Sequence, residues 1–255
     1  MLVASFRDNL GKSSQGGQTL YDHIMACVKV AHRILSDSRF VPEEYPRQKR
    51  DQLLFSVFIH DIGKLDPEFQ AMLRAARDSQ PFPPKRVKHE ASTLDFVTLL
   101  LESQEEVREH LHELLNYKFT ELIDIEDALA FAVSHHGLFY LSFEARDGQV
   151  LKRIRREWTV FNYAEKRRIT LTDLLFDYHP LGGLVIIADL LSSFCYEQAI
   201  ADADEIIHRA KSLRGLIDTL LREGAAETVE ESVREYDPRN YALRDLMILL
   251  AGGLV

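Results

Sequence analysis

The sequence is poor in cysteine and has no long uninterrupted apolar run. Its two cysteines, Cys27 and Cys195, are too few for a disulfide-stabilised secreted scaffold, and both lie in apolar helical surroundings. We therefore expect free, packed thiols and a reducing cytoplasm. The longest apolar run, Leu181 to Leu191, is interrupted by Asp189 and is too short to span a bilayer. No charged-then-apolar leader opens the chain, so neither a secretory signal nor membrane attachment is expected.

Positive charge is scarce as well: 31 Lys and Arg residues stand against 40 Asp and Glu residues, for a formal net charge of −9. This balance excludes a protein that coats nucleic acid by bulk electrostatic attraction. Basic residues are nevertheless concentrated between Arg146 and Arg168, where eight Lys and Arg occur with three acids. The next stretch, Ile169 to His208, has no Lys or Arg. The basic strip fits either a small footprint for a polyanion or a solvated surface, and both interpretations stay open.

Apolar residues recur mainly with the spacing of amphipathic helices. The pattern predicts helices from about Leu20 to Ile34, from near Asp51 to His60, from Asp66 onward, from about His89 onward, from Ala128 to His136 and from about Pro180 to Ala201. Two polar helices are expected within residues 203–255. An Asp–Gly pair at residues 147–148, between partly alternating stretches, predicts a short β-hairpin.

Two local signals predict where one of these helices ends and the next begins. Gly63 is expected to cap the helix that closes with His60–Asp61. Asp66–Pro67 is typical of an N-cap followed by a proline in the first helical turn. The expected fold is all-α: one domain over residues 1–255, a helical bundle with its core at about residues 10–200 and a short hairpin excursion.

Several metal-ligand residue types occur where simple packing would not place them. His60–Asp61 directly follows the apolar run Val57 to Ile59, where an unbalanced carboxylate would be costly. His135–His136 closes another apolar stretch, and adjacent histidines on a helix point about 100° apart, so they can hold one ion or two. Asp189 lies inside Leu184 to Leu191, where aspartate is rarely buried unless it is paired or binds a metal. Each feature alone is common, but together they predict a metal site.

The order of these motifs resembles the HD phosphohydrolase superfamily. More narrowly, it is similar to the HD nuclease of CRISPR type I interference, which works with a superfamily 2 helicase. The similarity extends over about residues 10 to 200. The matching segments are Leu20-Tyr21-Asp22-His23, Phe58-Ile59-His60-Asp61-Ile62-Gly63-Lys64, Asp66-Pro67-Glu68-Phe69-Gln70, Lys88-His89-Glu90-Ala91-Ser92, Ser134-His135-His136-Gly137 and Ala188-Asp189-Leu190-Leu191-Ser192-Ser193.

The resemblance implies two divalent metal ions that share one carboxylate. The first ion would be held by His23, His60, Asp61 and Asp189. The second would be held by Asp61, His89, His135 and His136. Asp61 and Lys64 would be the catalytic residues, with Lys64 beside the scissile phosphate or a water on the metal. Alternatively, Lys64 is a cation that the dipole favours at the C-terminus of a helix. Ser193 could likewise be an ordinary packing residue of its helix. The residues expected to contact substrate are Lys64, Ser193, Lys152, Arg153, Arg155 and Arg156.

A histidine-rich shell favours Mn²⁺, Fe²⁺, Co²⁺ or Ni²⁺ over Mg²⁺, which prefers oxygen ligands but stays an option. Zn²⁺ is expected to bind too, and tight binding could inhibit. The resemblance implies hydrolysis of single-stranded DNA by a cytoplasmic monomer, with the strand delivered by a separate CRISPR helicase subunit and a surveillance complex. Gly11-Lys12-Ser13 is not a helicase phosphate-binding loop, because Phe6 stands where a glycine is required.

Two other functions are compatible with the same residues. One is an HD phosphohydrolase of small nucleotides or cyclic dinucleotides, which would use the same metals in a closed pocket. The other is a non-catalytic interaction module that a metal ion stabilises. Cleavage that requires a polymer would exclude the first alternative, and any metal-dependent turnover would exclude the second.

Overall fold

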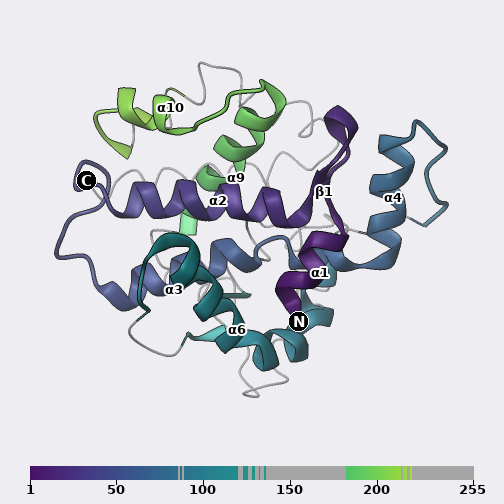
Figure 1. Ribbon diagram of the computed structural model, residues 1–255, viewed down its shortest axis with the longest axis horizontal. Helices are drawn as coiled ribbons and strands as arrows, with labels where there is room; N and C mark the ends of the chain where they lie inside the picture. The colour runs from purple at the N-terminus through teal and green to yellow at the C-terminus, as the bar shows by residue number, and fades with distance from the viewer. Residues whose placement is uncertain are drawn as a thin grey trace, which may run out of the picture.

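The computed structural model describes residues 1–85, 87, 89–119, 123–125, 128–129, 132, 135, 182–213, 215–216 and 219. This part of the chain is mainly helical, as the sequence predicts (Figure 1). The α-helices are α1 (Leu2–Asp8), α2 (Leu20–Leu35), α3 (Arg47–Ile59), α4 (Pro67–Arg77), α5 (His89–Ser92), α6 (Val97–Leu115), α9 (Gly182–Glu197) and α10 (Asp204–Arg209). Short 3-10 helices are η1 (Ser14–Gly16), η2 (Ile62–Leu65) and η3 (Thr93–Phe96), and the strands are β1 (Leu10–Lys12) and β2 (Gln18–Thr19).

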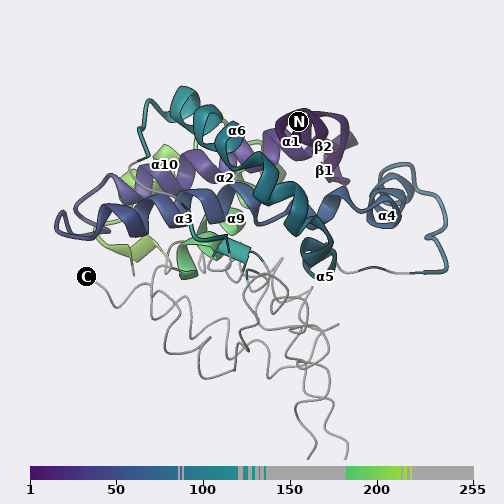
Figure 2. The ribbon, with the colours of Figure 1, turned by 90° about the horizontal axis from the view of Figure 1, so that it is seen from below.

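Three helices that contact one another, α2, α3 and α9, form the centre of the fold (Figures 1 and 2). Every residue of α3 from Asp51 to Ile59 is buried, and the run Leu184 to Ala188 of α9 is buried as well. A helix that is buried all round belongs in the interior of a bundle. The three helices therefore carry residues from distant parts of the sequence into one core.

Helix α2 begins where the sequence predicts, because its first turn is capped. The Thr19 hydroxyl accepts a hydrogen bond from the backbone N–H of Asp22 at 3.0 Å and donates to the Asp22 carboxylate at 2.6 Å. This reciprocal arrangement satisfies N–H groups that have no partner inside the helix and places a negative charge at its positive end. The cap thereby fixes the start of the helix three residues before His23.

Helix α1 and helix α6 are tied together at the N-terminus. The Glu106 carboxylate accepts hydrogen bonds from the backbone N–H groups of Leu2 and Val3 at 3.0 and 3.2 Å. Phe6 of α1 is fully buried, and its ring lies 5.4 Å from that of Phe58 on α3. Helix α1, which the apolar spacing did not predict, therefore covers one side of the central helices.

Strands β1 and β2 form a short antiparallel hairpin that the sequence did not indicate. Strands of two or three residues are too short to show the alternation that identifies a strand. The hairpin is held by the buried side chain of Gln70, which accepts from Leu10 N at 2.9 Å and donates to Leu10 O at 2.8 Å. The same amide donates to Lys64 O at 2.7 Å, so the hairpin lies beside η2.

The helix boundaries agree with the predictions to different degrees. Asp66 caps α4 through Glu68 N at 2.7 Å and Phe69 N at 3.3 Å, with Pro67 in the first turn, as predicted. The helix predicted to begin near Asp51 begins earlier, at Arg47, and α9 ends at Glu197 rather than near Ala201.

Residues 128, 129 and 132 are helical and residue 135 lies in a turn, in agreement with the helix predicted for residues 128–136. Among the residues that the structure describes, no helix combines the length and apolar character needed to cross a membrane. The predicted hairpin at residues 147–148 and most of residues 203–255 after α10 lie outside the described residues.

Candidate metal centre

Asp61 lies at the centre of four buried histidines. Its Oδ2 atom is 3.2 Å from His23 Nε2 and 3.5 Å from His60 Nε2. Its Oδ1 atom is 3.1 Å from His89 Nε2 and 3.6 Å from His135 Nε2. The two oxygens of one carboxylate therefore face two different pairs of imidazole nitrogens.

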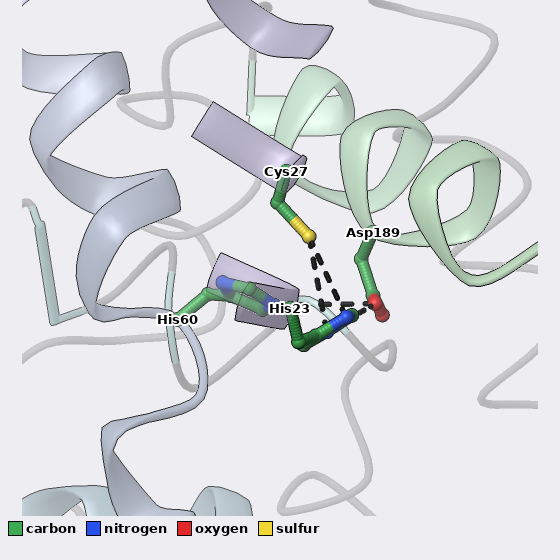
Figure 3. Close-up of side chains that lie close together, drawn as sticks. All are labelled: His23, Cys27, His60 and Asp189. Atoms are coloured by element: carbon green, nitrogen blue, oxygen red, sulfur yellow. Dashed lines mark hydrogen bonds and ion pairs between the residues drawn. The ribbon is translucent and has the colours of Figure 1, made fainter. Parts of the chain in front are cut away.

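Asp189 completes the group on the Oδ2 side of Asp61. It projects from α9, and its Oδ1 atom lies 3.2 Å from His23 Nε2 and 4.0 Å from His60 Nε2 (Figure 3). The structure thus brings together six of the seven residues predicted as metal ligands. The seventh, His136, lies outside the described residues.

The local structure after α3 sets the orientation of His60. Its Nδ1 atom lies 2.6 Å from the backbone oxygen of Val57, and the Nδ1 atom of His135 contacts the backbone oxygen of Ala132 in the same way. A carbonyl can only accept, so Nδ1 carries the hydrogen in both rings. The Nε2 atoms of the neutral rings are therefore free of hydrogen and face Asp61, as metal ligands require.

Gly63 has a different role from the predicted helix cap. Helix α3 ends at Ile59, and Gly63 lies inside η2, packed directly against the first residue of α5. A Cβ atom at this position would lie 1.7 Å from the backbone oxygen of His89. The absence of a side chain at Gly63 therefore allows His89 to approach Asp61.

The polar atoms of the site fit a divalent cation. Within the described residues, His60 Nε2 and Asp61 Oδ1 are buried without a hydrogen bond. Such atoms are costly in a protein interior unless a cation balances them. Two sets of ligand atoms also lie within 4.8 Å of one another: His60, Asp61 and His135, and His23, Cys27, His60 and Asp189. Imidazole with carboxylate suits first-row transition metals.

Lys64 is the nearest fixed cation. Its Nζ atom lies 2.6 Å from Asp61 Oδ2 and donates to the backbone oxygen of Gly11 at 3.1 Å. Burial alone would raise the pKa of Asp61, but Lys64 and His60 outweigh burial and hold that pKa well below its usual range. Burial likewise would raise the pKa of Asp189, but His23 and Lys12 lower it well below the usual value. Both carboxylates are therefore charged at neutral pH.

His23 and Cys27 form a buried pair one helical turn apart on α2. The Cys27 Sγ atom lies 3.8 Å from His23 Nε2 (Figure 3). Burial opposes charge on both groups, but the thiolate and the two aspartates raise the pKa of His23 to about 10. The imidazolium of His23 in turn lowers the pKa of Cys27 to about 6, against the effect of burial. In the metal-free site, the two groups thus favour each other's charged form.

Lys12 lies at the site although the sequence did not indicate it. Its Nζ atom donates to Ser193 Oγ at 2.6 Å, and Ser193 Oγ donates to Asp189 Oδ1 at 3.1 Å. Ser193 was predicted to contact substrate, and within the described residues it contacts the predicted ligand Asp189. Lys12 reaches it only because the hairpin docks against α9, a contact that no local pattern encodes. The other predicted substrate contacts, Lys152, Arg153, Arg155 and Arg156, lie outside the described residues.

A helical bundle in which a central His–Asp pair meets further histidines and a distant aspartate defines a metal centre of the HD type. The family model described as "Cas3, HD domain" matches residues 10–195, well over half of the chain, and the protein belongs to this family. Membership implies a metal-dependent nuclease that acts in a CRISPR context. The comparison with curated proteins and that with solved structures gave no match.

Proposed function

We propose that the protein is a nuclease that hydrolyses phosphodiester bonds of single-stranded DNA in CRISPR type I interference, with two divalent cations bridged by Asp61. The observation that supports this proposal is the position of Asp61 between two pairs of histidines. A carboxylate that offers one oxygen to each of two cation positions is suited to a two-metal site. His136 is proposed as a further ligand on the His89 and His135 side.

The residues of the site have separate tasks in this proposal. A bound pair of cations would supply Lewis acidity and a nucleophile from water near neutral pH. In their neutral forms, His60 and His135 would present unprotonated Nε2 atoms to a cation, because backbone carbonyls hold their Nδ1 hydrogens. Lys64 is buried at 7% exposure and places a fixed positive charge 2.6 Å from Asp61, where it would stabilise a phosphate oxygen. Mn²⁺, Fe²⁺, Co²⁺ or Ni²⁺ is the expected metal.

The proposed substrate requires help from other chains. With a formal net charge of −9, the protein as a whole repels DNA, so contact with the backbone would be confined to local cations. The basic strip from Lys152 to Arg156 is proposed to hold the strand. A separate CRISPR helicase subunit and a surveillance complex are proposed to deliver it.

Cleavage of labelled single-stranded DNA by metal-stripped protein tests this function. Mn²⁺, Ni²⁺, Co²⁺, Mg²⁺ or Zn²⁺ would be added back singly. Asp61→Ala would be compared with Asp95→Ala, because Asp95 is an exposed aspartate on η3. The expected result is metal-dependent cutting that Asp61→Ala abolishes and Asp95→Ala preserves.

The same metal-loaded protein distinguishes the nuclease from a small-nucleotide phosphohydrolase and from a non-catalytic interaction module. A parallel assay would offer mononucleotides and cyclic dinucleotides to each metal-loaded sample. Turnover of these compounds without cutting of DNA would replace the nuclease with a small-nucleotide phosphohydrolase. Metal binding without turnover of either substrate, together with a loss of stability in Asp61→Ala, would indicate an interaction module.

A further inference from the structure

Cys27 is the one predicted packing residue that lies among the ligand atoms. It is fully buried on α2, one turn after His23, and its Sγ atom is 3.8 Å from His23 Nε2. The Sγ atom lies within 4.8 Å of the ligand atoms of His60 and Asp189 as well. Figure 3 shows the thiol directed toward His23 and Asp189 rather than away from them. Residues four apart on a helix share a face, so α2 places the thiol on the side that carries His23.

The spacing of the four atoms is close to that of ligands around a single small ion. Ligand atoms about 2.0–2.3 Å from a tetrahedral ion lie roughly 3.3–3.8 Å from one another. The separations here are 3.2 Å for His23 Nε2 to Asp189 Oδ1, 3.8 Å for His23 Nε2 to Cys27 Sγ, and 4.0 Å for His60 Nε2 to Asp189 Oδ1. His60 Nε2 is fully buried, faces this cluster and makes no hydrogen bond within the described residues. Small movements would close the four atoms around one ion.

We infer that Cys27 is a thiolate ligand of the metal ion on the His23 side of Asp61. With His23, His60, Asp189 and the shared Asp61, it makes a set of five candidate ligands: two imidazoles, two carboxylates and one sulfur. This inference rests on the metal binding in the proposed function and is independent of the DNA substrate. Six predicted ligands supply only nitrogen and oxygen in the described structure, so the sulfur changes which ions the site prefers.

A thiolate makes this side of Asp61 a site for borderline and soft cations. Sulfur ligands favour Zn²⁺ and Co²⁺, whereas Mg²⁺ and Mn²⁺ prefer oxygen. The His89 and His135 side has no cysteine among the described residues, so its nitrogen and oxygen ligands would favour harder cations. The two positions are therefore expected to differ in the ion they retain, with Zn²⁺ or Co²⁺ held more tightly beside Cys27.

Cobalt absorption spectroscopy tests the assignment in the full chain. Co²⁺ would be titrated into metal-stripped wild-type protein, Cys27→Ser and Cys195→Ser. Cys195 is the matched control, because it is also a buried free cysteine but is absent from the ligand clusters. A thiolate-to-cobalt charge-transfer band is expected in wild type and Cys195→Ser and should be missing in Cys27→Ser. The Zn²⁺ affinity of Cys27→Ser should fall by about 100-fold, and its Mn²⁺ affinity by less than about 10-fold.

The outcomes distinguish a failure of the Cys27 assignment from a failure of the proposed metal site. Cobalt ligand-field absorption without a charge-transfer band in wild type would overturn the role of Cys27 and leave the metal site intact. Failure of wild type to bind any cobalt would overturn the metal site as well. If Cys27→Ser does not fold, zinc X-ray absorption of Cys195→Ser decides, since Cys27 is then the single thiol. A sulfur neighbour at about 2.3 Å is expected, and nitrogen and oxygen neighbours alone would reject the assignment.

Discussion

At the scale of single residues, the two sides of Asp61 carry different charges. The Lys64 ammonium lies 2.6 Å from Oδ2 and offsets negative charge there, whereas Asp189 adds a second carboxylate to that side. On the other side, Asp61 Oδ1 faces His89 and His135 at 3.1 and 3.6 Å. The electrostatic attraction for a cation is therefore set separately on the two sides of one shared residue.

Ser193 is expected to tune the metal ion through Asp189. Its hydroxyl donates to Asp189 Oδ1 at 3.1 Å and accepts from Lys12. Ser193→Ala should weaken metal binding by about 10-fold to 100-fold, as loss of a group that orients a ligand does elsewhere. Calorimetric titration with Mn²⁺ would measure this. Ser192→Ala is the control, because the buried Ser192 hydroxyl makes no hydrogen bond within the described residues. Equal affinities in the two variants would contradict the prediction.

Residue types and their order predicted most of the side chains that the structure brings together around Asp61, but they did not predict Cys27 or Lys12 there. Asp189 was recognisable because a carboxylate inside an apolar helix needs a partner. Cys27 was predicted to pack, since a thiol in an apolar helix satisfies packing and ligation equally well. Lys12 was not considered further, because Gly11-Lys12-Ser13 does not complete a phosphate-binding loop. Its role depends on where the hairpin docks, and this is a property of tertiary structure.

At the scale of secondary-structure elements, the contact between η2 and α5 joins the two sides of the site. Gly63→Ala would push a methyl group against the backbone of His89. The variant should lose about 1–3 kcal/mol of unfolding free energy, the usual cost of overpacking. Its affinity for a second cation should fall as well, because His89 must move.

Urea unfolding and a two-site metal titration would measure both effects of Gly63→Ala. Gly215→Ala is the control, because its new methyl group would meet only Ser212 Oγ, at 3.4 Å. Unchanged stability in Gly63→Ala would mean that η2 and α5 can separate without cost. In that case, the close contact would not be what positions His89.

Tyr117, which follows α6, forms a hydrogen bond to the central helix α3. Its hydroxyl donates to the buried Asp51 carboxylate at 2.5 Å. Burial and Asp51 together raise the pKa of Tyr117 to about 12. Because the folded state holds this proton more tightly than the unfolded chain, the stabilisation is complete below pH of about 10 and is lost as the pH rises through about 12.

Tyr117→Phe should therefore lower the unfolding free energy by about 1–3 kcal/mol near neutral pH, because Asp51 loses a hydrogen-bond donor. The deficit relative to wild type should shrink as the pH rises above about 10. Urea unfolding of both proteins over this pH range would measure it. If the deficit in unfolding free energy does not change with pH, the tyrosine proton does not contribute to stability.

The element pattern was predicted well where packing follows sequence periodicity. Helix α2, the capped start of α4 and the buried α9 all show the apolar spacing or cap residues that define them. The hairpin of β1 and β2 could not be predicted, because its strands are held by Gln70 from a distant helix. Gly63 was mistaken for a cap because the sequence does not show which backbone approaches it.

At the scale of the whole molecule, net charge and substrate have the same sign, so binding would depend on local cations. Contacts between these cations and phosphates release counterions, so the affinity should fall as the salt concentration rises. Alanine at Lys152, Arg153, Arg155 and Arg156 should reduce the slope of log affinity against log salt by about 3, at about 0.7 per contact with single-stranded DNA. Fluorescence anisotropy with metal-stripped protein would measure the slope.

A second fourfold variant separates local contacts from net charge. Alanine at the exposed residues Lys29, Lys118, Arg209 and Lys211 removes the same number of positive charges. This variant should bind DNA somewhat more weakly but keep the wild-type slope. Equal slopes in the two variants would show that the basic strip makes no direct contact with the strand.

The wide separation of the site residues along the chain has a consequence for the time course of folding. Residues 23, 60, 61, 89, 135 and 189 meet only after α2, α3 and α9 have docked. Helices form locally and fast, whereas contacts between distant segments must first overcome the entropy of closing long loops. The metal centre is therefore assembled late, and an ion cannot guide the early steps. We therefore expect a bound ion to act mainly by slowing unfolding, so that it prolongs the lifetime of the folded state.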